Sequence, residues 1–191
     1  MKRTIAKTTL VIVFATVFVL GIVSNAQAGE DGKEGSRPVT MTWSGTNVSN
    51  SQIILLPGFP TGESTEAGHS SLGAFNHQEL SAGGPPSGTC GGPNLIYFPS
   101  MAGAGVYRFQ DGSLLTTKIE QGSVCVDVTI PQGHVTVTYQ ITGGTGRFKN
   151  ASGTLMMAAT AAPVLFDAMD SPVFYTASGE TTGTIVLSNT E

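Results

Sequence analysis

The sequence predicts an all-β fold, an antiparallel barrel or sandwich built from many short strands. Apolar and polar residues alternate along most of the chain after Pro38, which is the period of a half-buried strand. In "GHVTVTYQIT", for example, Val135, Val137 and Tyr139 share one face, and the threonines between them share the other. Turn sequences separate such runs at regular intervals, and sustained helical periodicity is scarce.

The first 28 residues are expected to be a secretory signal helix. "MKRTIAK" carries three basic residues and no acid, an apolar run follows, and "AQA" at 26–28 has the small residues of a cleavage site. An uncleaved membrane anchor is the alternative, but the apolar run is short for a span of about 20 residues. Residues 29–37 are polar and glycine-rich, so we expect a disordered leader, followed by a single β-domain over 38–191.

The best-defined strands lie in the middle of the chain, where alternation and turn sequences agree. Strands at 104–109, 113–119, 123–130 and 133–142 form a predicted four-strand meander. "QDGS" and "IPQG" supply hairpin turns, and "EQG" supplies the corner between the second and third strands. Less sharply bounded strands are predicted at 39–46, 51–56, 94–98, 153–160, 173–177 and 182–188.

Two stretches lack this alternation. Residues 57–93 are rich in Gly, Pro and Ser and are expected to form a long loop with one strand near 67–75. Residues 161–172 are apolar but interrupted by prolines, so we expect a flap over one end of the domain.

Charge and cysteine content restrict the partners and the compartment. Without the signal, six Lys and Arg remain against thirteen Asp and Glu, a formal net charge of −7. Nucleic acids and anionic membranes attract clustered positive charge, so neither is an expected partner, and no stable membrane span is expected after cleavage. Export to the periplasm or the medium would expose Cys90 and Cys125 to oxidising conditions, where a lone cysteine pair usually forms a disulfide.

The glycine-rich stretch "ITGGTGRFKNASGT" does not match a phosphate-binding loop. A dinucleotide fingerprint requires a third glycine where Lys149 stands, and it requires a helix to follow. A P-loop requires Lys and then Ser or Thr after its last glycine, but Arg147 follows Gly146. No nucleotide and no other cofactor is therefore expected.

The same stretch fits a sharp corner between two strands. Glycines reach positive φ without steric cost, and a closing barrel needs such bends. A phenylalanine that follows the glycines would turn inward and plug the barrel end, and a further glycine would bend the next strand. The predicted structural corner comprises Gly143, Gly144, Gly146, Phe148 and Gly153.

The motif "GGTGRFKNASG" resembles the G-G-Ser/Thr-G-x-F-x-x-Ala/Val-x-G corner of the allene oxide cyclase and dirigent barrels, and more closely the corner of small exported bacterial proteins of that barrel type. "AGHSSLGAFN" at 67–76 is similar to a second stretch of those proteins, although His69 is displaced and Ser71 occupies the usual histidine position. The resemblance implies a closed barrel of about eight antiparallel strands with a central cavity. It does not imply a particular reaction, because the acidic catalytic residues of the cyclases and dirigent proteins have no counterpart in a motif of this chain. Related barrels are often dimers or trimers, so the resemblance makes a homo-oligomer one expectation.

Three residues are candidates for lining that cavity: Arg108, Asp127 and Tyr139. Arg108 lies within a predicted strand and is either a ligand anchor or the partner of Asp127 or Glu120 in a structural ion pair. Asp127 has strand-forming residues on both sides and faces either the cavity or the solvent.

Other catalytic or metal chemistry has weaker support. His69, His77 and Glu79 are the best candidate metal ligands, but their spacing follows no metal motif, so no metal is expected. The sequence contains no G-x-S-x-G elbow for a serine hydrolase and no identifiable carboxylate pair for a glycosidase.

These observations favour a non-catalytic exported barrel that binds a small apolar ligand or a partner surface. The first alternative is a cofactor-free isomerase or cyclase that uses Asp127, Arg108 or Tyr139. The second is a structural, envelope-associated protein whose barrel is filled with side chains. An open interior that contains a buried ionisable pair would favour the enzyme.

Overall fold

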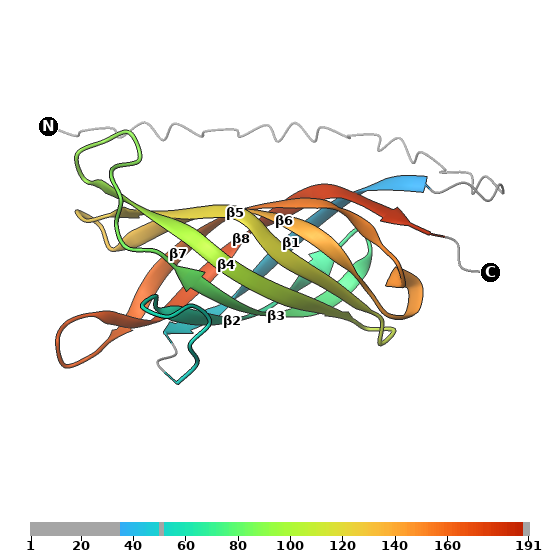
Figure 1. Cartoon of the computed structure of the whole chain (residues 1–191), viewed down its shortest axis with the longest axis horizontal. Coiled ribbons are helices and arrows are strands. Elements are labelled where there is room, and N and C mark those ends of the chain that lie inside the picture. The colour runs from blue at the N-terminus through green and yellow to red at the C-terminus, as the bar shows by residue number, and fades with distance from the viewer. Residues whose placement is uncertain (1–34, 50–51, 189–191) are drawn as a thin grey trace, which may run out of the picture. The chain divides into compact units, whose positions relative to one another are not determined.

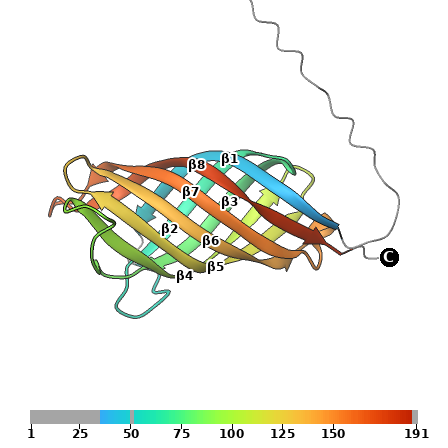
Figure 2. The ribbon, with the colours of Figure 1, turned by 90° about the horizontal axis from the view of Figure 1, so that it is seen from above.

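A computed structural model describes residues 35–49 and 52–188, which form a closed antiparallel β-barrel (Figure 1). The expected signal helix at 1–28 lies outside the described residues. Each strand pairs with its neighbours in the chain, and β8 pairs back with β1, as the view from above also shows (Figure 2). The strands are β1 (Gly35–Ser49), β2 (Thr61–Ser70), β3 (Gly73–Gly83), β4 (Leu95–Phe109), β5 (Leu114–Asp127), β6 (Gln132–Gly144), β7 (Ser152–Phe166) and β8 (Pro172–Leu187).

The predicted all-β barrel of eight strands is confirmed, but several strands are longer than predicted. The expected strands at 113–119 and 123–130 are one strand, β5, because a bulge between Ile119 and Gln121 lets the ladder continue past the predicted corner. The expected strands at 173–177 and 182–188 are likewise one strand, β8.

The largest error lies in residues 57–93, which were expected to form a loop. This segment contains β2 and β3, joined by a tight turn at 71–72, whereas the expected strand at 51–56 has no strand structure over its described residues 52–56. The expected flap at 161–172 is also wrong, because β7 continues to Phe166 and a short turn leads into β8. At the N-terminal side, β1 begins at Gly35, inside the expected leader, and pairs there with Leu187.

One end of the barrel, which we call the closed end, carries the turns at 71–72, 110–113 and 145–151. Large apolar side chains fill the interior here. Phe148 from the 3-10 turn η1 (Gly146–Phe148) is fully buried, and its ring centroid lies 4.8 Å from that of Phe109. Leu115, Leu155 and Ile185 beside it have no solvent exposure. Phe148 therefore lies in the interior position expected from the sequence.

The glycine corner leads from β6 into η1. Gly146 has a φ of 58°, a left-handed conformation that side-chain-bearing residues rarely adopt. A Cβ on Gly144 would collide with the carbonyl oxygen of Leu114, so the two strands approach closely there. Gly143 and Gly153, on either side of the corner, also have positive φ. These glycines therefore serve the backbone path that the corner requires.

Arg147 joins the three turns of the closed end. Its guanidinium lies 4.8 Å from the ring centroid of Phe148 and 5.0 Å from that of Phe109. The Nε atom lies 3.2 Å from Oδ2 of Asp111, and a terminal nitrogen donates a hydrogen bond to the carbonyl of Leu72. One exposed cation thus connects the β2–β3, β4–β5 and β6–β7 connections.

The opposite end, which we call the loop end, carries the connections at 50–60, 84–94, 128–131 and 167–171 (Figure 1). The expected disulfide between Cys90 and Cys125 is present, and it fastens the 84–94 connection to β5. Val124 and Val126 lie on the opposite face of β5 from Cys125, as the alternation predicted, because they pair with the inward-facing residues of β6.

Candidate functional site

A cluster of ionisable side chains lies inside the barrel, which we call the interior polar cluster. It consists of Glu66 on β2, His77 and Glu79 on β3, Tyr107 on β4 and Tyr139 on β6. All five are buried. The strand register brings them together, because residues directly opposite each other across a ladder share a face of the sheet. Glu66 pairs with His77 and His77 pairs with Tyr107, so these three form one row across β2, β3 and β4.

His77 is held in place from two sides. Its Nδ1 lies 2.9 Å from Oε2 of Glu66, which is hydrogen-bonding distance for a histidine–carboxylate pair. Its ring stacks on Tyr107, with centroids 4.0 Å apart and an interplanar angle of 18°. Gly105 leaves room for the imidazole, since a Cβ there would collide with Nε2. Packing and hydrogen bonding together therefore fix the orientation of the ring.

Glu79 is the group whose protonation the barrel changes most clearly. Burial, which disfavours the carboxylate, raises the pKa of Glu79 above its ordinary value of 4.5, and the nearby charge of Glu66 adds to the rise. The charge of His77 and hydrogen bonds from Tyr139 and Ser81 oppose it. Burial also raises the pKa of Tyr139 and of Tyr107 well above 10, so both phenols stay protonated. Glu79 is therefore a buried acid within a set of hydrogen-bonding groups.

Two atoms of this cluster have no hydrogen-bond partner: Nε2 of His77 and Oε2 of Glu79. A buried polar atom left unpaired costs about 1–3 kcal/mol, so most protein interiors avoid one. Both atoms belong to inward-facing side chains of β3, and Nε2 of His77 lies against Gly105 of the neighbouring strand β4. The barrel therefore retains an acid and a base side by side at a cost in stability.

Exposure of the inward-facing residues rises from the closed end toward the loop end. Leu155 and Ile185 at the closed end are completely buried, whereas Glu66 and Glu79 in the middle are 8% and 9% exposed. Nearer the loop end, partly exposed residues also face the barrel axis, because they pair with inward-facing residues on the neighbouring strands. Most of these are small: Asn47, Gly62, Ser81, Ala159, Ala161 and Ala177. The inward-facing residues near the loop end are therefore less completely buried than those at the closed end, and the polar cluster lies between the two.

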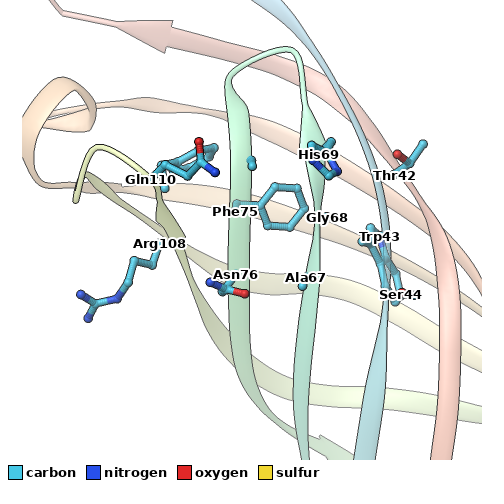
Figure 3. A pocket seen from close by; sticks show the side chains of 12 residues that line it. Thr42, Trp43, Ser44, Ala67, Gly68, His69, Phe75, Asn76, Arg108 and Gln110 are labelled. Carbon is cyan, nitrogen blue, oxygen red and sulfur yellow. The ribbon is translucent and has the colours of Figure 1, made fainter.

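A separate pocket lies on the outer wall of β1–β4 (Figure 3). Its exposed lining includes His69, Asn76, Arg108 and Gln110, and Figure 3 shows Arg108 extending away from β4. Arg108 therefore does not line the interior as expected, because it alternates with Tyr107 and Phe109, which face inward. It contributes to this outer pocket instead.

The other two candidate cavity residues differ from each other. Tyr139 is buried inside the barrel, where its hydroxyl lies 3.7 Å from Sδ of Met157. Asp127 is half-buried at the end of β5, where its carboxylate accepts hydrogen bonds from the N–H and hydroxyl groups of Thr129. Those bonds, the hydroxyl first, hold the pKa of Asp127 below its ordinary value. Asp127 therefore stabilises a turn and does not line the cavity.

The strongest metal candidate from the sequence is not assembled. His69 lies on the outer face of β2, whereas His77 and Glu79 face the interior, so the barrel wall separates them. No group of three or more His, Cys, Asp or Glu side chains in the described ranges is arranged to hold a metal ion.

Of the interior polar cluster, the sequence indicated only Tyr139 as a cavity-lining residue. Glu66 was not singled out, and His77 and Glu79 were considered only as metal ligands. A signal was present, because Phe75, His77 and Glu79 follow at intervals of two and therefore share a face with a large aromatic residue. A strand whose inward positions change from apolar to ionisable is the pattern that marks a polar site inside a barrel.

The chain matches no protein-family model and no curated protein. Within the described part of the chain, no helical segment has the length and apolar content of a membrane span. The resemblance to allene oxide cyclase and dirigent barrels therefore stays a prediction from the corner motif.

Proposed function

We propose that the barrel binds a small molecule that has an apolar body and one polar group, in the half of its interior nearer the loop end. The observation that carries the proposal is the set of small, inward-facing and partly exposed positions above the interior polar cluster. Eight-stranded barrels have interiors wide enough to hold one small ligand when their side chains are small. The ligand would enter at the loop end, since large apolar side chains fill the closed end.

The lining of this half favours a mainly apolar ligand. Val135, Ala159 and Ala177 pack against the apolar core from the loop end. Below them, the buried carboxyl groups of Glu66 and Glu79 offer hydrogen-bonding groups to the deepest part of the ligand. Ligand sites commonly combine apolar walls with a few polar groups that fix orientation. The ligand-binding protein that we propose is an exported protein, because the sequence predicts a signal peptide.

A second candidate function, proton-transfer isomerisation, is favoured by one specific observation. Glu79, a carboxyl with a raised pKa, and His77, a base held by Glu66, are adjacent on β3, and each has an unpartnered atom. Perturbed acids and bases of this kind are typical of enzymes that move a proton without a cofactor. Here the enzyme would use Glu79 and His77, not the Arg108 and Asp127 considered at first.

The binding proposal can be tested with a matched pair of substitutions on β7. Ala159 faces the interior and Ala158 faces the solvent. Ala159→Phe should fill the binding space and abolish binding, whereas Ala158→Phe should leave it intact. Trp43, the only tryptophan of the sequence, is buried inside the barrel and reports on the interior by fluorescence. Titration with 1-decanol and decanoic acid should change its emission in a saturable way.

Equal binding by the two phenylalanine variants, both folded by circular dichroism, would overturn the binding proposal. The catalytic candidate has a separate readout. A ligand that copurifies with the protein, identified by native mass spectrometry, should take up deuterium from D2O in the presence of the wild type. Glu79→Gln should bind the ligand yet lose this exchange. Exchange that persists in Glu79→Gln would exclude Glu79 as the acid.

A further inference from the structure

Large apolar side chains are exposed around the loop end of the barrel. They lie on the 50–60 connection, on the β5–β6 turn, and on the end of β7 and its turn into β8. The six that are more than half exposed, which we call the apolar rim, are Ile54, Val128, Ile130, Val164, Leu165 and Met169. Soluble proteins rarely expose so many large apolar side chains together without an interaction partner.

The two ends of the barrel differ sharply in this respect. The connections of the closed end contain Gln110, Asp111, Arg147 and Lys149, and no large apolar side chain of these connections is exposed. Only two exposed large apolar side chains of the described residues lie away from the loop end, Val106 and Met156; Met101 on β4 lies beside Gly84 of the 84–94 connection. The exposure of apolar side chains is therefore a property of one end of the barrel.

The charges of the loop end exclude an anionic partner. Residues 50–60, 84–94, 128–131 and 164–171 contain no Lys or Arg, so nothing there attracts a negatively charged surface. Two of the nearby carboxylates are turned back into their own turns. Asp127 accepts hydrogen bonds from Thr129, and Asp167 accepts them from the N–H groups of Met169 and Ser171. Two of the turns that carry rim residues thus hold a carboxylate that is hydrogen-bonded within its own turn.

The rim also lies at the end of the barrel where the inward-facing residues are partly exposed. Just inside it, inward-facing positions of β4 and β5 carry further partly exposed apolar side chains, among them Phe98, Val124 and Val126. An apolar path therefore runs from the rim into the barrel. A partner protein would need a complementary pocket for the apolar side chains of each turn. A fluid lipid surface can take up the apolar side chains of all the turns without a fixed shape.

From this arrangement we infer that the loop end docks on a neutral lipid surface, such as a phosphatidylcholine bilayer, by inserting the apolar rim. Docking places the opening of the barrel against the hydrocarbon region, so an apolar ligand passes between the bilayer and the interior without crossing water. The contact is peripheral, and it is driven by burial of apolar side chains and not by charge. It is independent of whether the barrel also catalyses a reaction.

Flotation of the folded chain with phosphatidylcholine vesicles tests the inference. The wild type should bind without added ligand. Its partitioning should not weaken with salt, because no ion pair contributes. Adding phosphatidylglycerol should lower the partitioning, since the protein is acidic.

A matched pair of methionines controls for non-specific adsorption. Met169→Asp, on the rim, should lower the partition coefficient at least about tenfold. Met156→Asp, at an exposed methionine of the barrel wall, should leave it unchanged. Both sites are exposed, so both variants should fold.

Several outcomes would overturn the inference. These are the absence of vesicle binding by the wild type, an equal loss of vesicle binding in the two methionine variants, or binding that requires anionic lipid. A dimer of the wild type in sedimentation that Met169→Asp dissociates, with no vesicle binding, would assign the rim to a second copy of the chain instead. Ligand binding in the interior is measured separately, by the change in tryptophan emission on titration with the ligand. Failure of lipid docking is therefore distinguishable from failure of ligand binding.

Discussion

Replacing Phe148 with alanine tests how the closed end of the barrel is held together. The side chain has no solvent exposure, and its ring lies beside both the ring of Phe109 and the guanidinium of Arg147. Deleting a buried phenylalanine costs about 3–5 kcal/mol, because transfer free energy is lost and a cavity remains. The loss should lie near the upper end, since the cation–π contact, worth about 0.5–1 kcal/mol at an exposed site, disappears as well.

This loss is a large fraction of the roughly 5–15 kcal/mol that stabilises a typical domain. At about 2–4 °C per kcal/mol for a chain of this size, the thermal midpoint should fall by roughly 6–20 °C. Thermal melts followed by far-UV circular dichroism measure it, and Phe166→Ala serves as the control, because Phe166 is 42% exposed. A Phe148→Ala melt within about a degree of wild type would refute the reasoning. So would a nucleotide that raises the wild-type midpoint, since the glycine corner would then bind phosphate.

Glu79→Gln should gain stability relative to wild type as the pH rises. Burial raises the pKa of Glu79 above 4.5, so the folded state keeps a proton that the unfolded state releases. The stability of the wild type therefore falls between pH 4.5 and the raised pKa. If the urea midpoints of wild type and variant changed in the same way over that range, the prediction would be wrong. Gly105→Ala should displace the His77 ring and lower the free energy of unfolding by about 1–3 kcal/mol. The NMR resonance of His77 should shift as well, and an unchanged resonance would exclude the clash. Replacing both Cys90 and Cys125 with alanine should cost about 2–4 kcal/mol in denaturant titrations, and unreduced wild type should show no free thiol.

The amino-acid sequence specified the parts of this barrel that depend on local chemistry. Alternation of apolar and polar residues identified the strands from 104 to 142 and the inward faces of β5 and β6, because side chains alternate between the faces of any strand. The glycines at 143, 144 and 146 identified a corner, since positive φ and close backbone approach are local requirements. The disulfide followed from having two cysteines in a chain with an expected export signal.

The boundaries of several strands depended on their neighbours. Residues 61–83 contain too many Gly, Ser and charged residues to be identified as strands, and they form β2 and β3 because β1 and β4 supply hydrogen-bonding partners on both sides. The bulge in β5 likewise keeps a strand continuous where the sequence indicated a corner. A segment with a weak intrinsic preference for β-structure forms a strand when both of its edges are paired. The sequence of that segment alone does not show this pairing.

Most of the candidate site was decided by the tertiary structure. Alternation assigns polar residues to the outside of a barrel, which holds for Arg108 but fails for Glu66, His77 and Glu79. Burial of these residues becomes tolerable because the closed register places Glu66 beside His77 and brings Tyr139, sixty residues later in the chain than Glu79, within hydrogen-bonding reach of that carboxyl. The sequence by itself thus determined which segments form strands around a glycine corner. Only closure of the sheet determined which polar side chains meet inside, because their partners come from strands far apart in the chain.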